Sequence, residues 1–154
     1  MRARLLCIFM LVLSVAQARV VTFIPESAAG MDGAFMIMLD DMIVMEVSDG
    51  TCSSDMLTLR NNGAALSFSS SDEPITNIHV IAVSGDPADR ISGSGYIASG
   101  GTGTWTGEAT NVTLANHASD WVGIQKIVVC TNGSVWGGDG SGDNEEPLGD
   151  EGTY

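Results

Sequence analysis

Aromatic side chains carry the clearest chemistry in this sequence. Indole and phenol rings stack on the apolar faces of sugar rings, and nearby amides and carboxylates bond the hydroxyl groups. Trp121 ends a polar segment, residues 116–121, that is typical of a loop, and Tyr96 stands in a short β-like run. We predict Trp121 and Tyr96 as ligand-binding residues that share one exposed concave face. A loop clamp over the sheet edge is the alternative role for Trp121, and Trp105 is expected in the core.

Cys52 and Cys130 are a second feature that could carry chemistry. They are the two cysteines that remain if the N-terminal apolar segment, with Cys7, is removed. Export would allow a disulfide between them. The bridge would close a loop of 78 residues and stabilise the fold by about 4 kcal/mol in the chain-entropy model. Because a bridge needs Cα atoms within about 7 Å, two isolated thiols on different strands stay open as the alternative.

Catalytic motifs are missing from the sequence. It contains no Gly-x-Ser-x-Gly elbow, no His-Glu-x-x-His helix and no phosphate-binding loop, and His79 and His117 are far apart. Several carboxylates are available for glycoside hydrolysis, namely Asp40, Asp41, Glu46 and Glu108. We therefore expect no catalytic residues and no cofactor, and we keep a small glycan-active hydrolase as the least favoured alternative.

Methionines form the one cluster of soft ligands, and five of them fall within fifteen residues: Met31, Met36, Met38, Met42 and Met45. Thioethers bind Cu(I), but no histidine or cysteine lies near this cluster and its flanks are apolar. The pattern favours adaptable packing in two adjacent strands, and we expect no metal site.

The N-terminus has the three regions of an export signal. Arg2 and Arg4 form a basic start, residues 5–15 are apolar, and Ala16-Gln17-Ala18 supplies a small-x-small cleavage pattern. We predict residues 1–18 as a signal peptide and a secreted or cell-surface chain that begins at Arg19. Loss of Arg2 and Arg4 would shift the formal charge from −13 to −15.

The C-terminal segment, residues 137–154, is rich in glycine and acidic residues. It can bury too little apolar surface to offset its ordering entropy, so we expect a disordered tail. Asp139 would begin an EF-hand count, but its sixth position is Asn144 instead of glycine and its twelfth is Asp150. The pattern therefore favours a solvated acidic tail over a calcium loop.

The body, residues 19–136, reads as a series of short strands. Apolar and β-branched runs alternate with Gly, Ser, Asn and Asp clusters, and no window has sustained helical periodicity. We expect strands at 20–24, 35–39, 42–47, 57–60, 65–68, 75–83, 95–98, 104–106, 111–114 and 124–129. Turn chemistry marks 48–50, 61–63, 85–87 and 100–101.

An internal echo supports this reading. Residues 65–68 are followed by a polar loop and then an Ile-x-x-Ile-x-Val run at 75–80, and residues 111–114 are followed in the same way by 124–129. We interpret the two units as similar hairpins of a two-sheet antiparallel β-sandwich.

Five sequence blocks follow one another along the chain, and their order is more specific than any block alone. They are residues 38–51, 59–70, 75–78, 124–129 and, most characteristic, the WTGEATNVTL block at 105–114. They resemble a β-sandwich module of secreted, often multi-domain proteins of Bacteroidetes-type bacteria, and the resemblance covers about residues 20–130. The resemblance implies a jelly-roll-like or adhesin-like sandwich at the cell surface and no established catalytic residues.

Charge and export narrow the classes of partner. Six basic residues stand against nineteen acidic ones, which argues against nucleic acid or anionic lipid because both need a basic face. No apolar run after the signal is long enough to span a membrane. We predict a secreted non-catalytic surface binding module for a glycan or a surface protein. A structural or assembly module of a cell-surface complex is the alternative, and the oligomeric state stays open.

Overall fold

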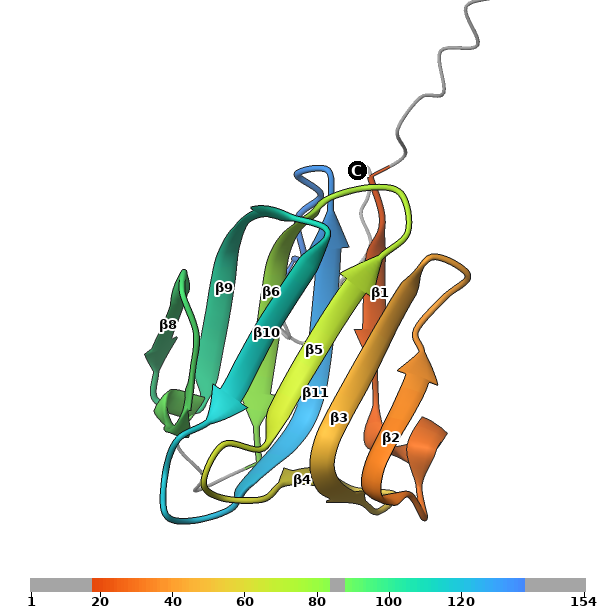
Figure 1. Cartoon of the computed structure of the whole chain (residues 1–154). Coiled ribbons are helices and arrows are strands. Elements are labelled where there is room, and N and C mark those ends of the chain that lie inside the picture. Colours follow the sequence, from red (N-terminus) through yellow and green to blue (C-terminus); the bar gives the residue numbers. More distant parts are fainter. Residues whose placement is uncertain (1–17, 84–87, 138–154) are drawn as a thin grey trace, which may run out of the picture.

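The computed structural model describes residues 18–83 and 88–137 (Figure 1). The expected signal peptide up to Gln17, the expected turn at 85–87 and the tail from residue 138 lie outside the described residues. The description below concerns the body between them.

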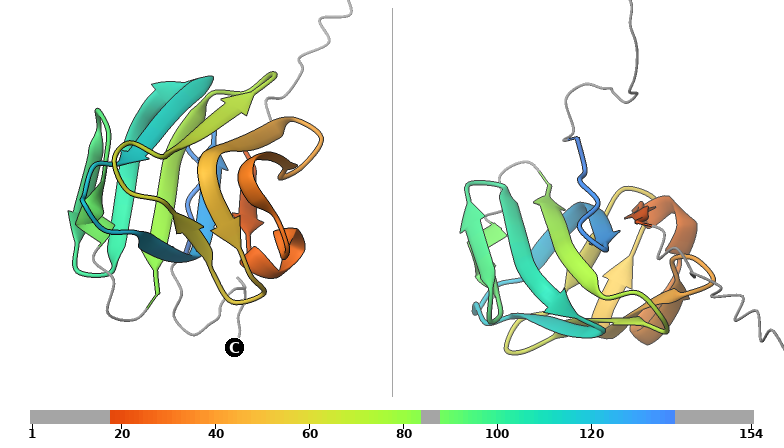
Figure 2. Two further views of the ribbon diagram at one scale, coloured as in Figure 1. Left: turned by 60° about the horizontal axis from the view of Figure 1, so that its bottom comes forward. Right: turned by 90° about the horizontal axis from the view of Figure 1, so that it is seen from above.

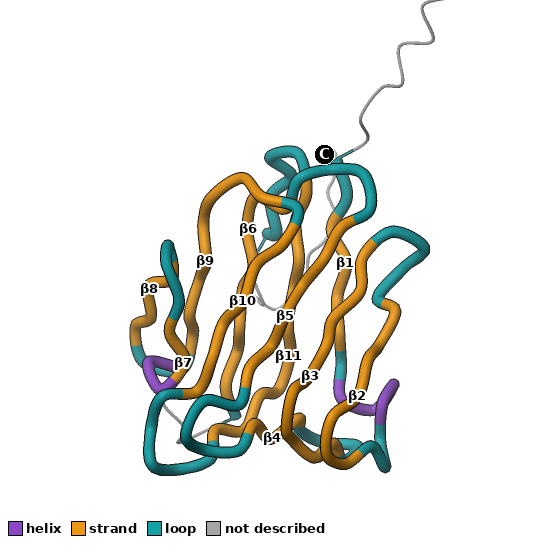
Figure 3. Tube along the Cα trace, in the orientation of Figure 1, coloured by secondary structure: helices purple, strands orange, loops and turns teal. Residues whose placement is uncertain are grey.

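Within the described residues, the body is built from strands, as the sequence predicts, and helix is limited to two short 3-10 turns (Figure 3). The turns are η1 (Pro25–Ala28) and η2 (Ala88–Arg90). The strands are β1 (Val20–Phe23), β2 (Asp32–Met38), β3 (Ile43–Cys52), β4 (Leu57–Leu59), β5 (Ala65–Ser70), β6 (Ile75–Ala82), β7 (Ile91–Ser92), β8 (Tyr96–Ser99), β9 (Thr102–Ala109), β10 (Asn111–Asn116) and β11 (Val122–Thr131). Within the described ranges, no helix has the length and apolar character of a membrane span.

All of these strands belong to one antiparallel sheet that is nearly closed. Its order is β7-β10-β5-β3-β4-β11-β6-β9-β8, with β1 on β11 and β2 on β3. In Figure 1, β10, β5, β3 and β2 lie in front of β9, β6, β11 and β1, and Figure 2 shows the same arrangement from above and from below. The all-β antiparallel prediction is confirmed. The finer description as a two-sheet sandwich is not confirmed, because the short strand β4 pairs with both β3 and β11 and joins the front to the back.

The internal echo has a different meaning from the one expected. β5 pairs with β10, and β6 pairs with β11. Neither β5 and β6 nor β10 and β11 pair with each other among the described strands, so the two units are not hairpins. The first strands of the two units, β5 and β10, lie side by side at the front of the sheet. The second strands, β6 and β11, lie side by side at the back.

Period-two alternation explains the core. Successive side chains of a strand point to opposite faces, so β3 turns Ile43, Met45 and Val47 inward and leaves Glu46 exposed. The same alternation buries Leu66 and Phe68 of β5, Val112 and Leu114 of β10, and Ile124, Ile127 and Val129 of β11. Trp105 of β9 also lies in the core, 7% exposed, and its indole N–H donates to the Ser94 carbonyl at 2.8 Å. The expectation that Trp105 fills the core is confirmed.

Two of the turns predicted from Gly and Asn residues are present in the structure, and a third predicted turn is wrong. Asn62 and Gly63 have φ of 61° and 104° in the turn before β5, and Gly100 has φ of 62° in the turn before β9, a region that Gly and Asn tolerate best. The predicted turn at 48–50 is wrong because these residues continue β3. Gly50 faces β4 so closely that a Cβ atom there would lie 2.6 Å from the Thr58 carbonyl oxygen.

Candidate functional site

Trp121 stands in the loop between β10 and β11, directly before the first residue of β11. Its position follows from strand pairing. Val122 of β11 is the register partner of Leu59 of β4, so the residue before Val122 and the residue after Leu59 come together at the same sheet end. The residue after Leu59 is Arg60, whose guanidinium carbon lies 5.6 Å from the centre of the Trp121 ring. Half of the Trp121 surface remains exposed, 50%.

The guanidinium of Arg60 is held in place by two carboxylates. Its Nη1 donates to Asp49 at 2.6 Å and its Nη2 to Asp32 at 2.9 Å. These hydrogen bonds and the two negative charges raise the pKa of Arg60 above its usual value against a smaller effect of burial. A planar cation fixed against an aromatic ring gives a cation–π contact, so Arg60 backs one side of the indole.

A buried amide fixes the backbone of the Trp121 loop. The Asn116 side chain is fully buried, at 0% exposure. Its Nδ2 donates to the carbonyls of Asp120 at 2.9 Å, Arg60 at 3.1 Å and Leu59 at 3.4 Å. Its Oδ1 accepts from the Ala118 N–H at 3.0 Å. One side chain therefore ties the loop that carries Trp121 to the end of β4 and to Arg60, which follows it.

Two further side chains bond to the backbone of the same loop. Arg90, at the end of η2, donates from Nη1 to the Trp121 carbonyl at 2.5 Å and lies 3.7 Å from the Asp120 carboxylate. Asn61 donates to the Ser119 carbonyl at 2.8 Å. These side chain to backbone bonds hold the backbone of the loop in place before any ligand binds. We call Trp121, Arg60 and Asp120 the Trp121 platform.

Tyr96, the second predicted ligand residue, lies in a different environment. It is partly buried against the core, and its hydroxyl donates to the Ala88 carbonyl at 3.0 Å. Its ring lies over Gly103, where a Cβ atom would come within 1.8 Å of the hydroxyl oxygen. Burial, with the Asp89 charge, raises the pKa of Tyr96 well above its ordinary value. Tyr96 and Trp121 both bond to η2 residues, but their sharing of one exposed face stays a prediction.

The sequence did not indicate Arg60, Arg90 or Asn116 as parts of a site. For Asn116 a signal was present, because it continues the alternation of Val112 and Leu114 and thus stands at an inward position. A polar residue at an inward position needs buried partners. For the two arginines no signal existed, since their proximity to Trp121 depends on contacts of 61 and 31 residues in sequence separation.

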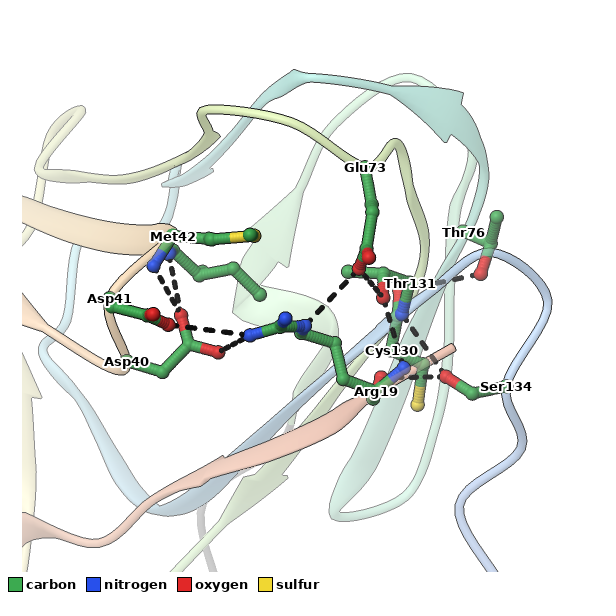
Figure 4. Close-up of polar contacts among 10 residues, drawn as sticks. Arg19, Asp40, Asp41, Met42, Glu73, Thr76, Cys130, Thr131 and Ser134 are labelled. Carbon is green, nitrogen blue, oxygen red and sulfur yellow. Dashed lines mark hydrogen bonds and ion pairs between the residues drawn. The ribbon is translucent and has the colours of Figure 1, made fainter. Parts of the chain in front are cut away.

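A second polar cluster lies where the first strand begins and β11 ends (Figure 4). Arg19 bridges Asp40 at 2.8 Å, Asp41 at 3.4 Å and the buried Glu73 at 3.2 Å. The Thr131 hydroxyl donates to Glu73 at 3.0 Å and accepts from the Arg19 backbone N–H at 3.1 Å. These contacts fasten Arg19, directly before β1, to two loops and to the last residue of β11.

Asp40, one of the four carboxylates considered for hydrolysis, has a structural role in this cluster. Its Oδ1 accepts from the backbone N–H groups of Met42 at 2.8 Å and Ile43 at 2.7 Å and so closes the turn between β2 and β3. Burial alone would raise its pKa, but these bonds and the Arg19 guanidinium together lower it. Its oxygens are occupied by backbone and arginine donors.

The other catalytic candidates lie apart from one another in the fold. Glu46 is exposed on β3, Glu108 is exposed on β9, and His117 is exposed in the Trp121 loop. The His79 ring bonds the Thr104 hydroxyl at 3.2 Å and lies 5.0 Å from the Trp136 ring, and burial lowers its pKa. Among residues 18–83 and 88–137, no group of three or more His, Cys, Asp or Glu side chains could hold a metal ion.

Both cysteines are free thiols in the structure. Cys52 belongs to the core and lies 3.3 Å from the Pro25 carbonyl. Cys130 is buried outside that core cluster, on β11 between Val20 of β1 and Asn77 of β6. The bridge that the sequence allows stays a prediction. Burial raises the pKa of both thiols, and for Cys130 bonds from Trp136 and Ser134 partly oppose that effect.

An open groove crosses the outer surface of β2, β3 and β5. Its volume is about 390 Å³, and Met36, Glu46, Ser48 and Ser67 are among its lining residues.

No protein-family model matches the chain, and no curated protein shows significant similarity to it.

Proposed function

We propose that the chain is a secreted, non-catalytic binding module with a jelly-roll-like β-sandwich fold, and that its ligand is a glycan bound at the Trp121 platform. Export rests on the N-terminal sequence pattern. Support for the fold comes from the nearly closed antiparallel sheet and from the order of the sequence blocks.

The main support for a binding site at Trp121 is that a half-exposed indole stands on a loop whose backbone is held in place. An exposed tryptophan on a mobile loop loses conformational freedom when it binds a ligand, and that loss weakens affinity. Here Asn116, Arg90 and Asn61 hold the loop before any ligand arrives. The fully buried amide of Asn116 thus helps to position the loop that carries an exposed aromatic residue.

The chemistry of the platform suits a neutral sugar ring. An indole face matches the apolar face of a pyranose, and the exposed carboxylate of Asp120, the residue before Trp121, can bond hydroxyl groups. The arginines do not add a free positive charge, since Arg60 is paired with Asp49 and Asp32 and Arg90 with Asp120. An acidic sugar would meet these carboxylates and the overall negative charge of the chain.

A glycan array with neutral and acidic oligosaccharides, followed by calorimetry on the best ligand, tests the proposal. We expect neutral glycans to bind and Trp121→Ala to weaken binding at least about tenfold, which corresponds to about 1.4 kcal/mol. Val135→Ala, which truncates an exposed apolar side chain outside the platform, at 81% exposure against 50% for Trp121, is the control and should bind as the parent does. Absence of any glycan ligand, together with capture of one defined surface protein that requires Trp121, would replace the glycan with a protein ligand.

A further inference from the structure

One arginine side chain faces three carboxylates where the folded body begins (Figure 4). The Arg19 guanidinium lies 2.8 Å from Asp40, 3.4 Å from Asp41 and 3.2 Å from Glu73. The Asp41 side chain is 84% exposed, but Asp40 and Glu73 keep only 22% and 7% of their surface. Solvent ions screen such buried charges poorly. Even without Asp41, two carboxylates therefore share the positive charge of one side chain.

The Glu73 carboxylate is bonded less completely than that of Asp40. Asp40 accepts two backbone N–H groups and one N–H of the guanidinium. Glu73 accepts the Thr131 hydroxyl at 3.0 Å. The Arg19 Nε also approaches Glu73, but within the described residues this buried nitrogen makes no hydrogen bond. A buried carboxylate in this state is stabilised by a further positive charge close to it.

The backbone nitrogen of Arg19 is the atom placed to supply that charge. It donates to the Thr131 hydroxyl at 3.1 Å, and the same hydroxyl donates to Glu73, so one oxygen atom separates the nitrogen from the carboxylate. The Arg19 carbonyl accepts from the Thr131 N–H at 3.0 Å and from the Ser134 hydroxyl at 2.7 Å. Ala18, on the other side of the peptide bond, is exposed. The fold therefore holds this nitrogen near Glu73 through bonds to Arg19 itself.

The charge of this nitrogen depends on what precedes it. When it is joined to Ala18, it is an uncharged amide. Hydrolysis of the Ala18–Arg19 bond adds one water molecule, leaves a carboxylate on Ala18 and converts the nitrogen into an amine. That amine takes up a proton at neutral pH, because α-amino groups have a pKa of about 7.7–8.0. The small-x-small pattern at residues 16–18 predicts that a signal peptidase cuts this bond.

We propose that cleavage between Ala18 and Arg19 completes the cluster. The ammonium group formed on Arg19 keeps the bond to Thr131 and supplies a second positive charge next to Glu73. The processed chain is then more stable than its precursor, so that export and stabilisation of the fold are coupled at one peptide bond. The inference rests on the export part of the proposed function and is independent of the glycan.

Two chains with defined N-termini test the inference, one that begins at Arg19 and one that begins three residues earlier, at Ala16. They differ in the position of the ammonium group. Near pH 6 and at low salt, chemical denaturation should give the chain from Arg19 a folding equilibrium constant about threefold larger, the effect of a half-unit rise in the pKa of its amine. Glu73→Gln keeps an oxygen for Thr131 but removes the charge, and should abolish this difference. Glu108→Gln, at an exposed position of β9, is the matched control and should preserve it.

Two further measurements do not depend on Glu73→Gln. Acetylation of the Arg19 amine restores an uncharged amide and should lower the equilibrium constant to that of the longer chain. Titration followed by nuclear magnetic resonance should give this amine a pKa above its ordinary range, because Glu73, Asp40 and Asp41 favour the charged form over the opposing effect of the guanidinium. The Cys130 thiol on β11 stays neutral there, since burial raises its pKa. The gain in stability should be present below about pH 7.7 and lost as pH rises through the raised pKa.

The N-terminal residue of the exported chain separates this inference from the proposed function. Intact mass after expression with residues 1–18 should identify Arg19 as the first residue. Retention of the chain in the cell would contradict the proposed secretion and the processing with it. Equal stability of the chains from Arg19 and Ala16, or a difference that survives acetylation, would overturn the inference alone and leave secretion and glycan binding standing.

Discussion

The Thr131 hydroxyl donates a hydrogen bond of 3.0 Å to the Glu73 carboxylate, and both residues are buried. A buried carboxylate is stable only when its oxygens are paired. The second contact of the same oxygen is the Arg19 guanidinium at 3.2 Å. The first residue after the predicted signal thus helps to neutralise the one buried acidic side chain among the described residues.

Removal of the Thr131 hydroxyl should destabilise the fold. Thr131→Val keeps the shape of the side chain but leaves the Glu73 oxygen and the Arg19 backbone N–H without this partner. We expect a loss of about 1–3 kcal/mol in the free energy of unfolding, measured by chemical denaturation. Thr102→Val on an exposed position of β9 is the control and should change stability by less than about 0.5 kcal/mol. Equal effects of the two substitutions would contradict the role given to Thr131.

Acid should weaken the turn between β2 and β3 through Asp40. The pKa of Asp40 is lower in the fold than its ordinary value of 3.8. The carboxylate therefore stabilises the fold above its unfolded pKa, and this contribution is lost as pH falls through the folded pKa. Asp40→Asn should have a smaller drop in Tm between about pH 6 and pH 3 than the parent chain. Thermal melts that fall in parallel for the two proteins would refute this assignment.

Asn116 should control both stability and the Trp121 loop. Asn116→Ala leaves three backbone carbonyls and the Ala118 N–H without their side-chain partner, and we expect a loss of about 3 kcal/mol. Fluorescence anisotropy should also report a more mobile Trp121. The control is Asn111→Ala, at an exposed position of β10. If the Asn116 variant matched that control in both measurements, the loop would not depend on this amide.

The thiols give a simple chemical test of the fold. Cys52 and Cys130 are free and buried, and their raised pKa values disfavour the reactive thiolate. Iodoacetamide should therefore label the native chain slowly and should add to both cysteines after unfolding without reductant. Intact mass measures this directly. Absence of label until a reductant is added would show that the two cysteines form the disulfide instead.

Alternation of side chains made most strands predictable, because burial of one face constrains every second residue. The run predicted at 75–83 is β6, Ile75–Ala82, and the run at 65–68 is the first part of β5. The turn predicted at 48–50 failed for a tertiary reason. Asp49 is bound by Arg60, and Gly50 packs against β4, so long-range contacts overrule the local turn preference there.

The site was predictable only in its most visible residue. Trp121 could be found because a tryptophan in a polar loop is unusual. Its setting could not, since Arg60 reaches it through the pairing of Leu59 with Val122. For Tyr96, the residue was predicted from the sequence but its packed surroundings were not. Its β-like context gave no sign that the hydroxyl would be bonded to Ala88 and the ring packed over Gly103.

Nuclear magnetic resonance of the three indole N–H groups tests the central claim most directly. Trp105 is buried with its N–H bonded to Ser94, Trp136 lies against His79, and Trp121 is half exposed beside Arg60. During titration with the glycan selected on the array, we expect the Trp121 signal to shift in proportion to occupancy while the Trp105 signal stays in place. Binding that leaves the Trp121 signal unmoved would contradict the account.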